Sequence, residues 1–169
     1  MEKRRSPARG WTLTEVMIVV AIMGILTTMA PNIMIQMTRF FRQNRARIEI
    51  QRDARTALDI INRNLRQAQA STVTVSQESG QPPYSRVDFT KYSGTSTAVM
   101  AFYQSGTSLF MVSRGTRAIS QNLRYLSFTY PRTDDDNIVS VSITMETGSY
   151  EGRTKALQLS VEKVRIMND

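Results

Sequence analysis

The chain contains no cysteine and no histidine among its 169 residues. Without cysteine it can form neither a disulfide nor a thiolate centre. Without histidine it lacks the commonest general base and the commonest protein ligand for metals. These two absences exclude histidine-based catalytic triads, the usual zinc sites and haem ligation by histidine.

Acidic residues are also few relative to basic ones. The chain has 22 Lys and Arg against 14 Asp and Glu, which gives a formal charge of +8 and a pI of about 10.3. Such basicity is compatible with nucleic acid, anionic lipid or an acidic protein as a partner, and equally with solubility alone. The length allows one membrane segment and one domain of modest size.

The longest feature of the sequence is a stretch of 23 residues without a charge, from Val16 to Thr38. As a helix it would measure about 34 Å, enough to cross a hydrocarbon core of about 30 Å. We therefore predict a transmembrane helix. Pro31 falls inside it, and membrane helices tolerate proline, so we expect a kink or a locally melted turn there.

A secretory signal peptide would explain a basic start followed by an apolar run, but this run is longer than the usual apolar core of about 7–15 residues. The positive-inside rule does not fix the orientation of the span, because Lys and Arg flank both ends. Four lie before it and four follow closely: Lys3, Arg4, Arg5 and Arg9, then Arg39, Arg42, Arg45 and Arg47.

A glutamate, Glu15, stands at the start of the apolar run, although a carboxylate at bilayer depth is costly. A small residue that could direct cleavage, Gly10, lies before the run rather than after it. Cleavage after Gly10 would remove a short basic leader, retain the whole apolar helix and make Trp11 the new N-terminus. Glu15 would then be the fifth residue.

This arrangement resembles the class III leader and cleavage site of type IV prepilins and type II secretion pseudopilins. The features that carry the resemblance occur in order: a basic leader at residues 1–10 ending in Gly10, the sequence Trp11-Thr12-Leu13-Thr14-Glu15, the uncharged span, and Pro31. The resemblance implies cleavage by a prepilin peptidase and N-methylation of Trp11. The chain departs from the family in having Trp11 where phenylalanine is usual, which leaves the efficiency of methylation open.

The resemblance also implies a role for Glu15. In an assembling filament, Glu15 of one subunit would meet the N-terminal ammonium of a neighbour, and the pairing would offset the cost of each charge in an apolar setting. The alternative interpretation is that Glu15 is an interfacial residue at a helix start, where the helix dipole favours a negative charge.

Residues 39–70 have the pattern of an amphipathic helix that continues the span. Apolar residues recur there at spacings of four and three, forming one stripe that is typical of a buried helix face. Asp59 and Arg63 are four apart, a spacing that favours an ion pair. We expect one helix over residues 12–70, and we expect residues 11–38 to serve as the transmembrane and polymerisation segment. The stripe comprises Ala54, Leu58, Ile61, Leu65 and Ala68, broadened by Ile50 and Ala57.

From residue 71 to 169 the helical period gives way to alternation, with Gly, Pro, Ser and Thr in the breaks. Short connections favour antiparallel pairing, so we predict a meandering sheet laid on the helix stripe. In the last expected strand, Leu157, Leu159 and Val161 form the apolar set. The expected strands are 71–77, 86–92, 97–104, 108–114, 122–130, 138–147 and 154–166. The fold class is α+β, and this order of elements matches the pilin-like fold.

Finer features favour particular members of that family. Residues 52–70 look like the corresponding helix of minor pilins and minor pseudopilins, particularly the W- and J-type subunits, which would initiate or tip the filament. The absence of a disulfide-bounded loop separates the chain from many major pilins, although cysteine-free major pilins exist. The resemblance implies a single-pass protein of the cytoplasmic (inner) membrane, with its globular domain outside the cytoplasm, that later enters a filament.

Other interpretations remain. The chain could be an uncleaved single-span protein whose extracytoplasmic domain binds a ligand or DNA, and eight arginines between Arg39 and Arg66 are the basis for DNA. Asp134, Asp135 and Asp136 offer the oxygen ligands that Ca²⁺ prefers, but consecutive carboxylates are more typical of a solvated turn. The carboxylates Glu146, Glu151 and Glu162 show no catalytic spacing, so we expect neither an enzyme nor a cofactor.

Overall fold

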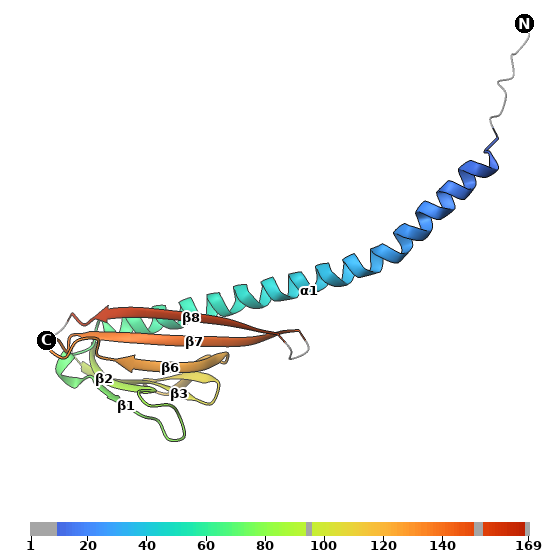
Figure 1. Ribbon diagram of the computed structural model, residues 1–169. Helices are drawn as coiled ribbons and strands as arrows, with labels where there is room; N and C mark the ends of the chain where they lie inside the picture. The colour runs from blue at the N-terminus through green and yellow to red at the C-terminus, as the bar shows by residue number, and fades with distance from the viewer. Residues whose placement is uncertain (1–9, 94–95, 151–153, 168–169) are drawn as a thin grey trace, which may run out of the picture. The chain divides into compact units, whose positions relative to one another are not determined.

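The computed structural model describes residues 10–93, 96–150 and 154–167 (Figure 1). The chain divides into two compact units, Met1–Phe41 and Arg42–Asp169. Helix α1 (Leu13–Leu65) belongs to the first unit at its start and to the second at its end. The basic part of the expected leader, residues 1–9, lies outside the described residues.

In the first unit, α1 continues through Pro31 without interruption. The hydroxyl of Thr27 donates to the carbonyl of Met23 at 2.7 Å, and the hydroxyl of Thr28 donates to the carbonyl of Ile25 at 2.8 Å. Threonine hydroxyls in membrane helices donate hydrogen bonds to backbone carbonyls of the preceding turn in this way. The locally melted turn expected at Pro31 is therefore wrong, whereas the kink stays a prediction.

In the second unit, α1 buries one face, and the predicted stripe is confirmed. Ile61 and Ala57 have no exposed surface, and Ile50 and Ala54 have 1%. The ion pair expected between Asp59 and Arg63 is not formed: none of the salt bridges between described residues includes either side chain.

Helix α1 ends at Leu65 and not at residue 70 as expected. The following residues leave the helix because they pair with strand β2 (Arg86–Ser93). Ala68 forms an isolated antiparallel bridge with Lys91, and the N–H of Gln69 donates to the carbonyl of Thr90 at 2.8 Å. A short 3-10 helix, η1 (Ala70–Thr72), then leads into the strands.

The strands form two antiparallel sheets, one of five strands in the order β1-β2-β3-β4-β5 and one of three in the order β6-β7-β8. Their pairing is antiparallel throughout, as the short connections predict. The bounds of the other strands are β1 (Thr74–Ser76), β3 (Ser96–Ser105), β4 (Ser108–Val112), β5 (Thr116–Ser120), β6 (Leu123–Thr129), β7 (Ile138–Tyr150) and β8 (Thr154–Arg165).

The predicted α+β fold, with antiparallel strands packed on the helix, is confirmed, but the strands form two sheets instead of one meander, and strand β5 was not predicted. Residues 116–120 carry two adjacent apolar residues, Ala118 and Ile119, so they show no alternation for sequence analysis to detect. After β5 the chain does not pair back on it. Instead, the N–H of Leu123 donates to the carbonyl of Thr107 at 2.8 Å, and β6 begins a second sheet with β7.

Both sheets pack with the α1 stripe into one hydrophobic core. Phe89 on β2 and Phe102 on β3 stack in it, with ring centroids 6.0 Å apart. The buried side chain of Gln104 joins the two sheets, because its Oε1 accepts from the N–H of Leu126 at 2.9 Å and its Nε2 donates to the carbonyl of Arg124 at 3.1 Å. A buried amide whose polar atoms are satisfied in this way fixes how the sheets meet.

Strand β8 faces the opposite way from its expected apolar pattern. Its register with β7 places Val164 opposite Val139 and Glu162 opposite Val141. The two β7 valines are core residues. Adjacent residues of a strand point to opposite faces, so the alternate set points outward. Leu157, Leu159 and Val161, the apolar set of the predicted strand, are 56%, 64% and 59% exposed, so the apolar face of β8 points away from the core.

Candidate processing and assembly site

The candidate cleavage junction lies just ahead of α1. Gly10 and Trp11 are exposed, and Trp11 leaves 75% of its surface accessible. A Cβ atom placed on Gly10 would meet no atom within 4 Å. Nothing in the described part of the chain shields this peptide bond, so an enzyme has access to it, and glycine is not required at this position by the fold.

Thr12 and Glu15 form a reciprocal cap at the start of α1. The carboxylate of Glu15 accepts from the backbone N–H of Thr12 at 2.9 Å and from its hydroxyl at 3.1 Å. In return the hydroxyl oxygen of Thr12 accepts from the N–H of Glu15 at 3.3 Å. This is a capping box, in which Thr12 is the N-cap residue and Glu15 is the third residue of the helix.

Sequence analysis missed the structural role of Thr12. The signal was present as a threonine followed three residues later by a glutamate and then an apolar run, which is the usual signature of a capping box. Among the described residues, no salt bridge includes Glu15. Its carboxylate therefore has a role inside its own helix, and pairing with an ammonium of another chain stays a prediction.

The first unit presents α1 as an apolar helix without a covering layer. It is long and apolar enough to cross a membrane, and the most apolar window of the helix has no buried residue. Large apolar side chains are exposed all along it, such as Leu13 at 79%, Met34 at 73% and Phe41 at 62%. An apolar surface of this extent requires lipid or other protein to cover it.

The three aspartates of the candidate calcium site do not converge. Asp134 accepts from Arg132 in a salt bridge of 3.2 Å, and Asp135 accepts from the N–H of Asn137 at 3.0 Å. The described residues contain no group of three or more Asp, Glu, His or Cys that could hold a metal ion. Asp136 acts on Tyr130 instead: burial, and secondly the charge of Asp136, raise the pKa of that phenol.

Taken together, fold and site define a class of protein in which an exposed apolar helix is joined to an α+β domain. Comparison with known families adds one match: residues 5–31 match the prokaryotic N-terminal methylation motif, a type IV prepilin-like motif. The matched range contains Gly10, Trp11, Glu15 and Pro31. No curated protein and no solved structure matches the chain.

Proposed function

We propose that the chain is a prepilin-like structural subunit that a prepilin peptidase cleaves after Gly10 and that is then N-methylated at Trp11. The subunit assembles through α1 into a type IV pilus or a secretion pseudopilus, as a minor component that initiates or tips the filament. The single observation that carries this proposal is the methylation motif at residues 5–31, which spans the junction between an accessible glycine and an apolar helix.

The geometry of the junction supports the cut. Cleavage after Gly10 would release the leader and leave α1 whole, with its capping box intact, because Thr12 and Glu15 both remain on the mature chain. The new α-amino group would lie on Trp11, directly before the N-cap residue. This ammonium would lie within about one helical turn of Glu15 along the chain. In a filament it could therefore pair with the carboxylate of Glu15 from a neighbouring subunit.

The exposed helix supports assembly. Before assembly the apolar side chains of residues 11–38 would lie in the inner membrane, with the globular domain outside the cytoplasm. In the filament the same side chains would pack against the helices of other subunits, where close packing replaces contacts with lipid. The proposal assigns the chain a structural role and no enzyme activity.

Mass spectrometry of the protein purified from its host tests the proposal. A mature chain that begins at Trp11 and carries the mass of one added methyl group is the expected result. The matched control is Gly10→Val, which the open space around Gly10 accommodates without disturbing the fold. The variant should accumulate uncleaved in the membrane, and a wild-type chain that retains Met1 would show the proposal to be wrong.

Two other candidates are distinguished by related measurements. The first is an uncleaved single-span protein with a binding domain, in which Glu15 would serve only as the partner of Thr12 in its own helix. The same mass spectrum decides against that candidate if Met1 is absent. A major pilin would dominate sheared filaments, whereas the proposed minor subunit should be a trace component of them.

A further inference from the structure

The apolar part of α1 carries two side-chain carboxamides, Asn32 and Gln36. Both lie inside the uncharged stretch Val16–Thr38, and Asn32 is about 9 Å along the helix from the end of that stretch. No hydrogen bond between described residues includes either side chain. In hydrocarbon an amide without a partner is costly, so both carboxamides require a partner from outside their own helix. The threonine hydroxyls of the same stretch differ, because they donate to backbone carbonyls of α1; they belong to Thr27, Thr28 and Thr38.

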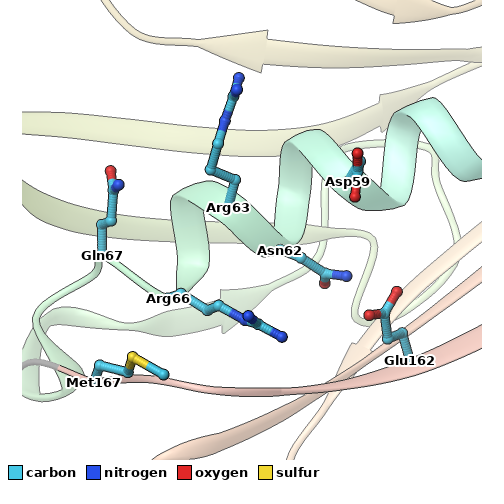
Figure 2. A pocket seen from close by; sticks show the side chains of 7 residues that line it. All are labelled: Asp59, Asn62, Arg63, Arg66, Gln67, Glu162 and Met167. Carbon is cyan, nitrogen blue, oxygen red and sulfur yellow. The ribbon is translucent and has the colours of Figure 1, made fainter.

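In the second unit, the carboxamides of α1 lie against side chains of the chain's own strands. Asn64 accepts from Nζ of Lys91 on β2 at 2.7 Å. Asn62 extends into a hollow of about 450 Å³ toward Glu162 of β8 (Figure 2). The most apolar window of α1 has no buried residue, so no described part of this chain offers a neighbour to the two carboxamides of the first unit.

Asn32 and Gln36 continue a row of residues spaced by four that begins with Gly24 and Thr28, and we call these four residues the polar row. Residues four apart on a helix lie one above the other along one side. A Cβ atom on Gly24 would meet no atom within 4 Å, so the chain itself does not require glycine there, although glycine weakens a helix relative to alanine. Small residues let the backbones of two membrane helices approach closely, and polar residues form hydrogen bonds between them. The polar row has both features.

We propose that two copies of this chain associate in the membrane through the polar row before a filament is assembled. Rows of residues spaced by four favour a right-handed crossing of the two helices. At this crossing Asn32 of one copy pairs with Asn32 of the other, because a carboxamide has both donors and an acceptor and so complements a second carboxamide. The inference rests on the part of the proposed function that places α1 across a membrane, and it does not rest on cleavage after Gly10.

The depth of Asn32 favours a second copy over an unrelated membrane helix. Two copies enter the membrane in the same orientation, so their Asn32 side chains lie at the same depth. An unrelated helix would need an amide or hydroxyl at that depth and on the facing side, and without one the carboxamide would stay unpaired in hydrocarbon.

The charged residues at the two ends of the span are compatible with this contact. Glu15 is nine residues before Gly24, which places it about 180° around the helix from the start of the polar row. The contact therefore leaves Glu15 uncovered for the filament. Arg39 follows the row on the same side, but it lies beyond the uncharged stretch, where a long side chain reaches the headgroups.

Because the chain contains no cysteine, disulfide formation between introduced cysteines reports the contact. Thr28→Cys places a thiol in the polar row, whereas Thr27→Cys places one about 100° away around the helix. The two variants are matched, since each native hydroxyl donates to a carbonyl of its own helix. In liposomes that contain only the purified full chain at low density, oxidation should convert Thr28→Cys into covalent dimers and leave Thr27→Cys mostly monomeric.

Energy transfer between fluorescent labels measures the affinity. The labels are attached to Val99→Cys, because Val99 is an exposed strand valine of the globular domain, at 69%. Asn32→Leu should weaken self-association about tenfold, the loss expected for a pair of hydrogen bonds between membrane helices. Gly24→Ile should weaken it as well, by holding the backbones apart. Met34→Leu is the matched control, since Met34 lies at a similar depth but about 200° around the helix from Asn32, and it should associate as the wild type does.

Three results would overturn the inference: a full chain that enters the liposomes but stays monomeric, equal self-association of N32L and M34L, or a purified chain that stays monomeric while Thr28→Cys cross-links to a different protein in host membranes. Each of these leaves the proposed function intact. A chain that does not enter liposomes at all would overturn the membrane role of α1 in the proposed function, and the inference with it.

Discussion

Replacing Glu15 by glutamine separates the charge of this residue from its hydrogen bonding. Glutamine serves in a capping box as glutamate does, so E15Q keeps the acceptor for the N–H and hydroxyl of Thr12 but loses the negative charge. Glu15→Ala loses both. Thr12→Ala keeps the charge and the backbone N–H but loses the hydroxyl that exchanges hydrogen bonds with Glu15.

The energies indicate that all three variants should still enter the membrane. Loss of a threonine N-cap costs about 0.5–2 kcal/mol of helix stability. The span Val16–Thr38 contains nine Val, Ile and Leu residues, which favour insertion by roughly 3–5 kcal/mol on biological scales. The cap is the smaller quantity, so its loss frays the first turn and leaves the span inserted.

The assay compares the amount of each variant in the membrane fraction with the amount in sheared filaments. If Glu15 acts through its charge, E15Q and E15A should both be absent from filaments, whereas T12A should be incorporated. If Glu15 acts only as a cap, E15Q should be incorporated like the wild type, while E15A and T12A are impaired. Normal incorporation of E15Q would thus refute the charge-pairing role that the proposed function requires.

Further predictions concern the globular domain. Ile61→Ala should lower the free energy of unfolding by about 2–5 kcal/mol because Ile61 is fully buried, whereas Ile48→Ala, at a site 65% exposed, should change it by less than about 0.5 kcal/mol; urea denaturation measures both. Removal of residues through Phe41 should leave a soluble folded domain, since all core residues follow it; aggregation of that fragment would contradict the boundary. The free energy of unfolding should fall as pH rises above 10.0, the ordinary pKa of tyrosine. Burial and Asp136 raise the pKa of Tyr130 in the folded state, so the unfolded phenol loses its proton first. Tyr130→Phe should make that fall shallower in urea denaturation at high pH.

Sequence analysis predicted burial correctly where the geometry of a single element decides which residues are buried. The helix stripe was readable because its spacing follows the geometry of a single helix, and Ile61 and Leu65 are buried as predicted. It failed for β5, which has no alternation of its own and exists because β4 pairs with it. It also failed at the end of α1, where pairing of Ala68 and Gln69 with β2 overrides local helix preference.

The sequence by itself determined the apolar helix, and it also contained the signature of the Thr12–Glu15 cap that our sequence analysis missed, because both depend on residues within a few positions of one another. Only the tertiary structure decided which face of β8 is buried. Alternation states that Leu157, Leu159 and Val161 share a face, but it does not say which face is buried. The register with β7 places the other set of β8 residues opposite Val139 and Val141, which pack in the core with the α1 stripe, so Leu157, Leu159 and Val161 point away from it. The same pairing placed Glu162 beside Asn62, more than half the domain away along the chain.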